Sequence, residues 1–150
     1  MKTTSRLLLF SFLLVSSIAF GAAADVPLAN QISPDALHRM LQSNQRSKLL
    51  ILNVGPRVLF RQAHLPGAVF IGPTSDPRGV EILRDRMKHE SKKKMVIVYC
   101  GCCPWDRCPN VKPAYDVLRK LGFTNVKVLH IGNNFGSDWV DRGFPVERGE

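Results

Sequence analysis

Four short apolar runs divide the chain, and their pattern predicts buried strands. The runs cover residues 49–54, 68–71, 95–99 and 126–129. Each run is nearly continuous instead of alternating between apolar and polar positions, which is typical of strands that are buried on both faces. The clearest run, 95–99, leads directly into Cys100.

Helical patterns lie between and around these runs. A first helix is predicted to open at Ser33, followed by proline and aspartate, because serine caps helices and proline suits their first turn. A second helix is predicted over 79–88 and a short one over 138–141. The longest pattern places apolar residues at helical spacing over 111–121, with Asn110 as its cap.

Strands buried on both faces that alternate with helices predict an α/β fold, in which helices wrap a parallel sheet on both sides. No internal repeat or linker divides the sequence after its N-terminal segment, so we expect a single domain. Ligands of such sheets bind beyond the carboxyl ends of the strands. Cys100 stands at one of these ends, and this position favours a functional role.

Residues 1–24 predict a signal peptide rather than a part of the fold. Lys2 and Arg6 precede a short apolar stretch, and small residues then lead up to Asp25. This is the three-part pattern of a secretory signal, and its apolar stretch is short for a membrane span. We therefore expect a mature domain over 25–150, a periplasmic or secreted location, and no membrane association after cleavage.

The chain is basic, with 21 lysine and arginine residues against 12 aspartate and glutamate residues and a net charge of +9. Removal of Lys2 and Arg6 with the signal peptide would lower the net charge from +9 to +7. The positive residues are spread along the sequence, apart from 92–94, and aromatic residues do not alternate with them. This distribution favours a solvated surface that attracts small anions. We expect no nucleic acid partner.

All four cysteines of the chain lie in one loop, as Cys100, Cys102, Cys103 and Cys108. A disulfide framework spreads its cysteines so that they close long loops, which this cluster cannot do. The loop also contains two prolines and a charged pair, for which core packing gives no reason. The cluster therefore indicates a chemical site.

Cys100 is predicted to be the catalytic nucleophile. A cysteine between a buried strand and a helix meets backbone N–H groups and the positive end of that helix, which lower its pKa and populate the thiolate. Gly101 permits the sharp turn, and Arg107 and Lys112 supply positive charge. Such a thiolate can attack the outer sulfur of an anionic donor such as thiosulfate, hold it as a persulfide, and pass it on without a general base.

The other cysteines leave two alternatives open. Cys108 or Cys103 could resolve a persulfide on Cys100 by forming a disulfide, as in a thiol–disulfide redox protein that meets oxidants outside the cell. The thiolates could instead bind zinc or, through Cys100 and Cys102, a cuprous ion. The spacing C-x-C-C-x4-C is cramped compared with structural zinc sites, so we predict no resident metal and no cofactor.

Three further residues near the predicted site have specific interpretations. Trp105 either shields the cysteine from water, contacts a protein partner or simply packs, and Asp106 pairs at most with Arg107. His64 is predicted to brace its own turn by hydrogen bonding to the backbone, because attack by a thiolate needs no base.

The motifs of the chain, in their order and spacing, resemble those of the rhodanese family over nearly the whole mature sequence. Segment 63–68, Ala-His-Leu-Pro-Gly-Ala, is similar to the family's Gly-His-Ile-Pro-Gly-Ala, and segment 96–100 resembles the strand that ends in its persulfide cysteine. Segments 32–37 and 121–126 resemble further parts of the family pattern. The loop CGCCPWDRCPN is typical of an exported single-domain subgroup.

This resemblance implies a five-stranded parallel sheet with helices on both faces, and a rhodanese-type sulfurtransferase that forms its persulfide on Cys100. It also implies that the loop from Gly101 to Cys108 cradles the outer sulfur. The expected partners are a small anionic sulfur donor, a thiol or cyanide-like acceptor, and possible exported proteins.

The chain also departs from the family pattern. Segment 53–55, Asn-Val-Gly, stands where the family has Asp-Val-Arg, so a member of the usual ion pair is missing, although Arg57 and Arg61 lie close by in the sequence. The loop is a few residues longer than in single-domain rhodaneses. Pro104 and Pro109 lack N–H groups, so the family's cradle cannot simply be copied onto this loop.

Overall fold

The computed structural model describes residues 26–150 as a five-stranded parallel sheet flanked by helices. Its strands are β1 (Gln31–Ile32), β2 (Leu49–Asn53), β3 (Val69–Phe70), β4 (Met95–Tyr99) and β5 (Val126–Leu129). Their order across the sheet is β1-β5-β4-β2-β3, and each neighbouring pair is parallel. The predicted α/β class and the five-stranded parallel sheet are therefore confirmed. The predicted signal peptide and its cleavage point lie outside the described residues.

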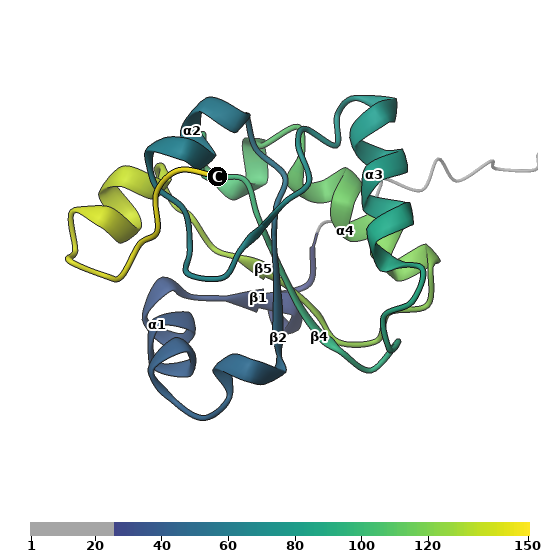
Figure 1. Ribbon diagram of the computed structural model, residues 1–150, viewed down its shortest axis with the longest axis horizontal. Coiled ribbons are helices and arrows are strands. Elements are labelled where there is room, and N and C mark those ends of the chain that lie inside the picture. Colours follow the sequence, from purple (N-terminus) through teal and green to yellow (C-terminus); the bar gives the residue numbers. More distant parts are fainter. Residues whose placement is uncertain (1–25) are drawn as a thin grey trace, which may run out of the picture.

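Helices cover both faces of the sheet (Figure 1). The first face carries α1 (Pro34–Gln42) and the short π-helix η4 (Gly136–Val140), and the second carries α3 (Pro77–Met87) and α4 (Val111–Lys120). The remaining helical segments are α2 (Arg57–Gln62) and the 3-10 turns η1 (Leu28–Asn30), η2 (Arg46–Lys48) and η3 (Trp105–Arg107). Within residues 26–150, every helix is too short or too polar to cross a membrane.

Side-chain caps determine where two of the helices begin. The Ser33 hydroxyl accepts the Ala36 N–H at 3.2 Å, which confirms the predicted start of α1. The Asp76 carboxylate accepts the Arg78 N–H at 2.8 Å, and proline occupies the next position. This cap starts α3 two residues before the predicted boundary, because an acidic side chain satisfies a free N–H group of the first turn.

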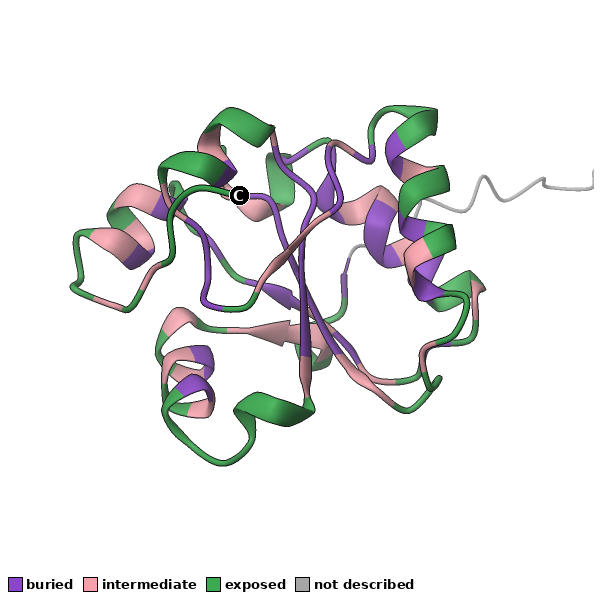
Figure 2. Cartoon of the chain, viewed as in Figure 1, coloured by how far each residue is buried: buried purple, intermediate pink, exposed green. Residues whose placement is uncertain are grey.

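Successive side chains of β4 enter two separate cores, one on each face of the sheet. Val96 and Val98 pack with residues of α3 and α4, whereas Ile97 and Tyr99 pack with residues of α1 and η4. All four side chains are at most 1 % exposed. Burying an aliphatic side chain of this size contributes roughly 1.5–3 kcal/mol. Burial on both faces explains the continuous apolar runs, and Figure 2 shows it along the central strands.

Two segments near the sheet edge differ from the sequence-based prediction. The helix α2 at Arg57–Gln62 was not predicted, since only Phe60 of its residues is buried and no side chain caps its start. The short helix expected over 138–141 is a π-helix at Gly136–Val140, in which the Asp141 N–H donates to the Gly136 carbonyl at 2.8 Å.

The pairing of β2 with β4 places the candidate site. The two strands run in register from Leu49 beside Met95 to Asn53 beside Tyr99. The Val54 N–H then donates to the Tyr99 carbonyl at 2.9 Å, so both chains leave the sheet at the same edge. Cys100 therefore emerges at the carboxyl edge of the sheet beside the chain that leaves β2.

Candidate active site at the cysteine loop

Cys100 follows β4 directly and is only 3 % exposed. The next residue, Gly101, turns the chain with a φ of +87°, a backbone conformation that favours glycine. Its carbonyl accepts the Phe135 N–H at 3.0 Å, and a Cβ placed on Gly101 would lie 2.9 Å from the Phe135 Cβ. The predicted need for glycine at this turn is thus met by both its backbone angle and its close neighbour.

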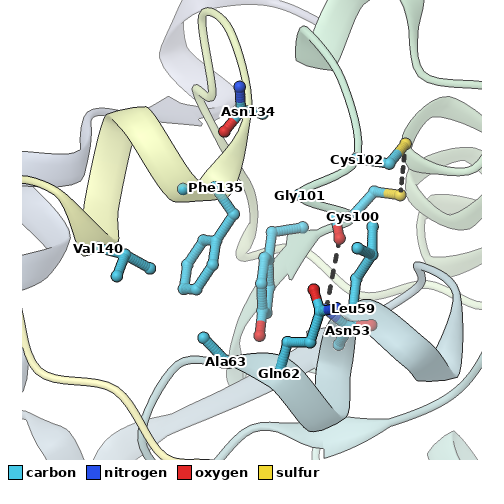
Figure 3. Close-up of a pocket in the computed structure, with 12 residues that line it drawn as sticks. Asn53, Leu59, Gln62, Ala63, Cys100, Gly101, Cys102, Asn134, Phe135 and Val140 are labelled. Carbon is cyan, nitrogen blue, oxygen red and sulfur yellow. Dashed lines mark hydrogen bonds between the residues drawn. The ribbon is translucent and has the colours of Figure 1, made fainter.

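The four cysteine sulfurs gather at this turn. Cys100 Sγ lies 3.3 Å from Cys102 Sγ, and Cys102 Sγ lies 2.8 Å from Cys103 Sγ. The sulfurs of Cys100, Cys102 and Cys108 all lie within 4.8 Å of one another, and we call this group the thiol trio. All four cysteines are free thiols. Figure 3 shows the Cys100 side chain turned toward Cys102.

An amide side chain from the start of α4 contacts the Cys100 sulfur. Asn110 Nδ2 donates to Cys100 Sγ at 3.6 Å, and the backbone N–H of Cys102 is also directed at that sulfur. The Asn110 side chain is held in turn, because its Oδ1 accepts the Ser75 N–H at 3.0 Å. The backbone carbonyl of Asn110 accepts the Thr74 hydroxyl at 2.5 Å. Asn110 was predicted to cap α4, but its side chain makes no capping bond and serves the sulfur site instead.

The charge of the loop is shared between two buried thiols. Hydrogen bonding from Cys100 lowers the pKa of Cys108 to about 5, and the backbone N–H groups of Asn110 and Val111 lower it further. The same bond, together with burial, raises the pKa of Cys100 above the ordinary value. The helix start was expected to stabilise a Cys100 thiolate. Its N–H groups instead point at Cys108 and favour the thiolate of that partner sulfur.

We expect thiolate absorbance in the ultraviolet to reveal one thiol that ionises with a midpoint near pH 5. Its pKa lies below the ordinary 9.0, so its ionisation stabilises the fold fully above pH 9 and loses that effect as the pH falls through 5. Cys108→Ser should remove the acid step. Cys103→Ser should keep it, because burial raises the pKa of Cys103 to about 12. A wild-type titration with no step below pH 7 would contradict this assignment.

Two residues at the end of the adjacent strand β2 and just beyond it surround the Cys100 backbone. Asn53 Nδ2 donates to the Cys100 carbonyl at 3.4 Å, and Asn53 Oδ1 accepts the Gly55 N–H at 3.0 Å. A Cβ built on Gly55 would lie 2.5 Å from the Cys100 carbonyl oxygen and 3.2 Å from its Sγ. The departure from Asp-Val-Arg therefore fits this loop, because an amide and a glycine occupy the places where Cys100 needs a donor and space.

A pocket of about 410 Å³ opens beside Cys100. Helix α2 and the segment that enters η4 form its walls, as Figure 3 shows. Apolar side chains make up much of the lining, and its polar side chains are the amides of Asn53, Gln62 and Asn134 together with Tyr99 and Cys102. Among residues 26–150, no lysine or arginine lines it. The lining residues are Asn53, Leu59, Gln62, Ala63, Tyr99, Cys100, Gly101, Cys102, Asn134, Phe135, Gly136 and Val140.

The predicted loop residues divide into two groups. Gly101 and Cys102 line the pocket with Cys100, whereas the other predicted residues of the loop do not. Trp105 is partly buried, and its ring centroid lies 5.6 Å from that of His130. Asp106 and Arg107 are exposed on η3, and no ion pair joins them among the described residues.

Three cationic residues near the loop, namely Lys112, Arg61 and Arg57, have partners elsewhere. Lys112 pairs with Asp116 at 2.7 Å. Arg61 pairs with Glu150, and the Arg57 guanidinium stacks over the Phe70 ring at 4.1 Å. The positive charge that the sequence led us to expect beside Cys100 is therefore supplied by N–H groups instead of lysine or arginine side chains.

His64 has the bracing role predicted for it. The side chain is buried, and its Nδ1 lies 2.7 Å from the Phe60 carbonyl. Its ring stacks on Phe60 at 3.8 Å between centroids, and its backbone exchanges hydrogen bonds with Glu147 at 2.9 Å in both directions. These contacts hold the turn after α2, which forms one wall of the pocket.

The chain matches the family model of the rhodanese-like domain over residues 33–134, which is more than half of its length. A comparison with curated proteins found no match. Among solved structures, the BH2092 protein from Bacillus halodurans has a TM-score of 0.61 at 23% identity, covering 81% of this chain and 78% of that one.

Two further structures share the fold. The rhodanese-like domain of the Alr3790 protein from Anabaena sp has a TM-score of 0.56 at 23% identity, with 79% of each chain covered. An EanB variant, solved as a cysteine persulfide with ergothioneine, has a TM-score of 0.58 at 23% identity, covering 79% of this chain and 28% of that one. Together with the family match over most of the folded chain, these observations lead to one conclusion: the protein belongs to the family of rhodanese-like domains.

Proposed function

We propose that this protein is an exported sulfurtransferase that carries sulfane sulfur as a persulfide on Cys100. Rhodanese-like domains generally transfer sulfur. The observation that carries the proposal is the position of Cys100 at the carboxyl end of β4, beside a pocket and with amide hydrogens directed at its sulfur. Such hydrogens would stabilise a negative charge on Cys100 or on an added outer sulfur.

In the first step, Cys108 takes the proton of Cys100 as Cys100 attacks the donor. With thiosulfate, the Cys100 sulfur forms a bond to the outer sulfur, the sulfur–sulfur bond of the donor breaks, and sulfite leaves with the electron pair. Cys100 Sγ and Cys108 Sγ lie within 4.8 Å of each other, so a transfer of the Cys100 proton to Cys108 would place the negative charge on the nucleophile. In this proposal Cys108 acts as the base, whereas the sequence led us to expect that the Cys100 thiolate attacks the donor without a general base.

In the second step, a thiolate acceptor attacks the outer sulfur of the persulfide. The new sulfur–sulfur bond forms on the acceptor, and Cys100 leaves as a thiolate that recovers a proton from Cys108. Cyanide would attack the same outer sulfur, form a carbon–sulfur bond to it and leave as thiocyanate, while Cys100 again leaves as a thiolate. The EanB variant, which shares this fold over 28% of its chain, was solved as a cysteine persulfide, and this supports a persulfide intermediate here.

The lining of the pocket bears on the choice of donor. Its polar side chains are neutral amides and hydroxyl or thiol groups, and no lysine or arginine of the described part of the chain lines it. A divalent anion such as thiosulfate loses more hydration energy in such a pocket than a singly charged organic persulfide. We therefore expect organic persulfides to be better donors than thiosulfate.

A thiol–disulfide redox function is the second candidate, and one observation favours it. Cys108, with its lowered pKa, lies within 4.8 Å of Cys100. Attack of the Cys108 thiolate on the inner sulfur of a Cys100 persulfide would form a disulfide and release hydrosulfide. Cys103 is the weaker resolving candidate, because burial raises its pKa to about 12 and keeps its thiol protonated.

Intact mass measurement tests the proposal. The reduced protein should gain the mass of one sulfur atom after treatment with polysulfide or thiosulfate, and lose it again after addition of a thiol acceptor. Alkylation and peptide mapping should locate the added sulfur on Cys100. A loss of two hydrogens with a Cys100–Cys108 bridge would favour the redox function, and an unmodified Cys100 would overturn both.

A further inference from the structure

We propose that the thiol trio of Cys100, Cys102 and Cys108 is a binding site for a soft, thiophilic metal ion, cuprous copper. The proposal concerns binding alone, so it stands or falls independently of sulfur transfer. Three sulfurs from two sides of one loop converge on a single point, although the loop contains no disulfide. Convergence of this kind is what a metal ion requires of its ligands.

The distances suit a site with three sulfur ligands. A bond of about 2.3 Å between metal and thiolate, as found for zinc, puts the sulfurs of a planar three-coordinate site about 4 Å apart. The three sulfurs lie within 4.8 Å of one another, and those of Cys100 and Cys102 are 3.3 Å apart. Cys102 is exposed, so its side chain has room to move its sulfur from this distance toward the spacing of about 4 Å.

The chemistry of the ligands selects a soft ion. Among the described residues, no imidazole or carboxylate joins the trio, so the site would offer sulfur alone. Thiolates favour cuprous copper and zinc over hard cations such as magnesium or calcium. Zinc in structural sites takes four protein ligands, whereas Cys103 contacts Cys102 at 2.8 Å without joining the group of mutually close sulfurs. Three ligands therefore favour cuprous copper.

The surroundings would stabilise the charge of the occupied site. Three thiolates around one cuprous ion carry a net charge of −2, after their protons have passed to solvent. The Asn110 amide donates to Cys100, and the first backbone N–H groups of α4 point at Cys108. These groups act as fixed positive dipoles at the buried side of the trio.

The exposed sulfur of Cys102 gives an ion a path to the two buried sulfurs of the trio. Cys100 and Cys108 are 3 % and 5 % exposed, and Cys102 is exposed. An ion would therefore meet Cys102 first and then the two buried sulfurs, which the end of β4 and the start of α4 hold in place. Occupation of the trio would engage the Cys100 sulfur and block any attack by it on a sulfur donor.

Anaerobic titration of the reduced protein with cuprous ion, against a coloured cuprous chelator, tests the site. One equivalent should bind, and Cys102→Ser should weaken binding by about a hundredfold or more, because it removes one of three ligands. Cys102 is exposed, so this variant should fold. X-ray absorption of the loaded protein should show three sulfur neighbours of copper at about 2.3 Å.

Cys103→Ser is the matched control, because it changes the same residue type in the same loop and should alter the affinity by less than about threefold. An equal loss in both variants would overturn the trio as the ligand set. A wild-type protein that leaves all cuprous ion with the chelator would overturn the site altogether. Zinc titrated in parallel should bind more weakly than copper, and tighter zinc binding would overturn the choice of ion.

Discussion

Replacing Cys100 by serine is expected to lower sulfur transfer from polysulfide or thiosulfate by about a thousandfold or more, to the rate without enzyme. A serine hydroxyl stays protonated under these conditions and cannot hold the transferred sulfur as a persulfide. The same substitution should leave the fold intact, since the side chain changes by a single atom and Asn110 Nδ2 can donate to the new oxygen. The measurement is the initial rate of sulfite or thiocyanate formation.

Cys103→Ser provides the comparison for this result, because it removes a sulfur from the same loop without touching the nucleophile. Its rate should stay within about threefold of the wild-type rate. Cys108→Ser should fall between the two, since it leaves the nucleophile in place but removes the group that takes its proton. Undiminished turnover by the Cys100 variant would exclude Cys100 as the sulfur carrier.

The sheet and its two layers of helices could be predicted because burial on both faces leaves a direct mark on the sequence. The run at 95–99 has no polar position, since its alternate side chains enter two cores that are both apolar. The start of α1 was equally readable, because a serine cap and a proline are local signals. Helix α2 follows Pro56 but has no side-chain cap, and its Phe60 ring packs beside Phe70 and His64.

At the site, local reasoning identified the cysteine and missed the groups that surround it. Gly101 was predictable, because a turn after a buried strand favours glycine. Asn110 carried a misleading signal, since an asparagine before a helix normally indicates a cap, whereas its amide here contacts Cys100 across the loop. The coupling of Cys100 with Cys108 depends on how the loop folds back, and residue spacing alone does not determine it.

Gly55 shows how a departure from a family pattern acquires a physical reason in the fold. The sequence presented it as the loss of an ion-pair member. In the structure, the space beside its Cα is filled by Cys100, whose carbonyl would lie 2.5 Å from a Cβ at this position. The Asn53 amide donates to that same carbonyl, so the two residues together determine where Cys100 lies.

Gly55→Ala is therefore expected to displace Cys100, because a contact of 2.5 Å with a backbone oxygen cannot be relieved by a side-chain rotation. Overpacking of this kind typically costs about 1–3 kcal/mol of unfolding free energy. A displaced nucleophile should also lower sulfur transfer by about tenfold or more, since catalysis depends on the placement of reacting atoms. Thermal unfolding and initial rates measure the two effects separately.

Gly132→Ala is the matched control, because both glycines lie in loops and neither has a positive φ. A Cβ on Gly132 would meet only Asp138 Oδ2, at an ordinary 3.7 Å, so this variant should keep the stability and rate of the wild-type protein. If Gly55→Ala behaved like Gly132→Ala in both measurements, the loop would have to hold Cys100 away from Gly55 in solution. The close approach of Cys100 to the chain after β2 would then not be what positions the sulfur.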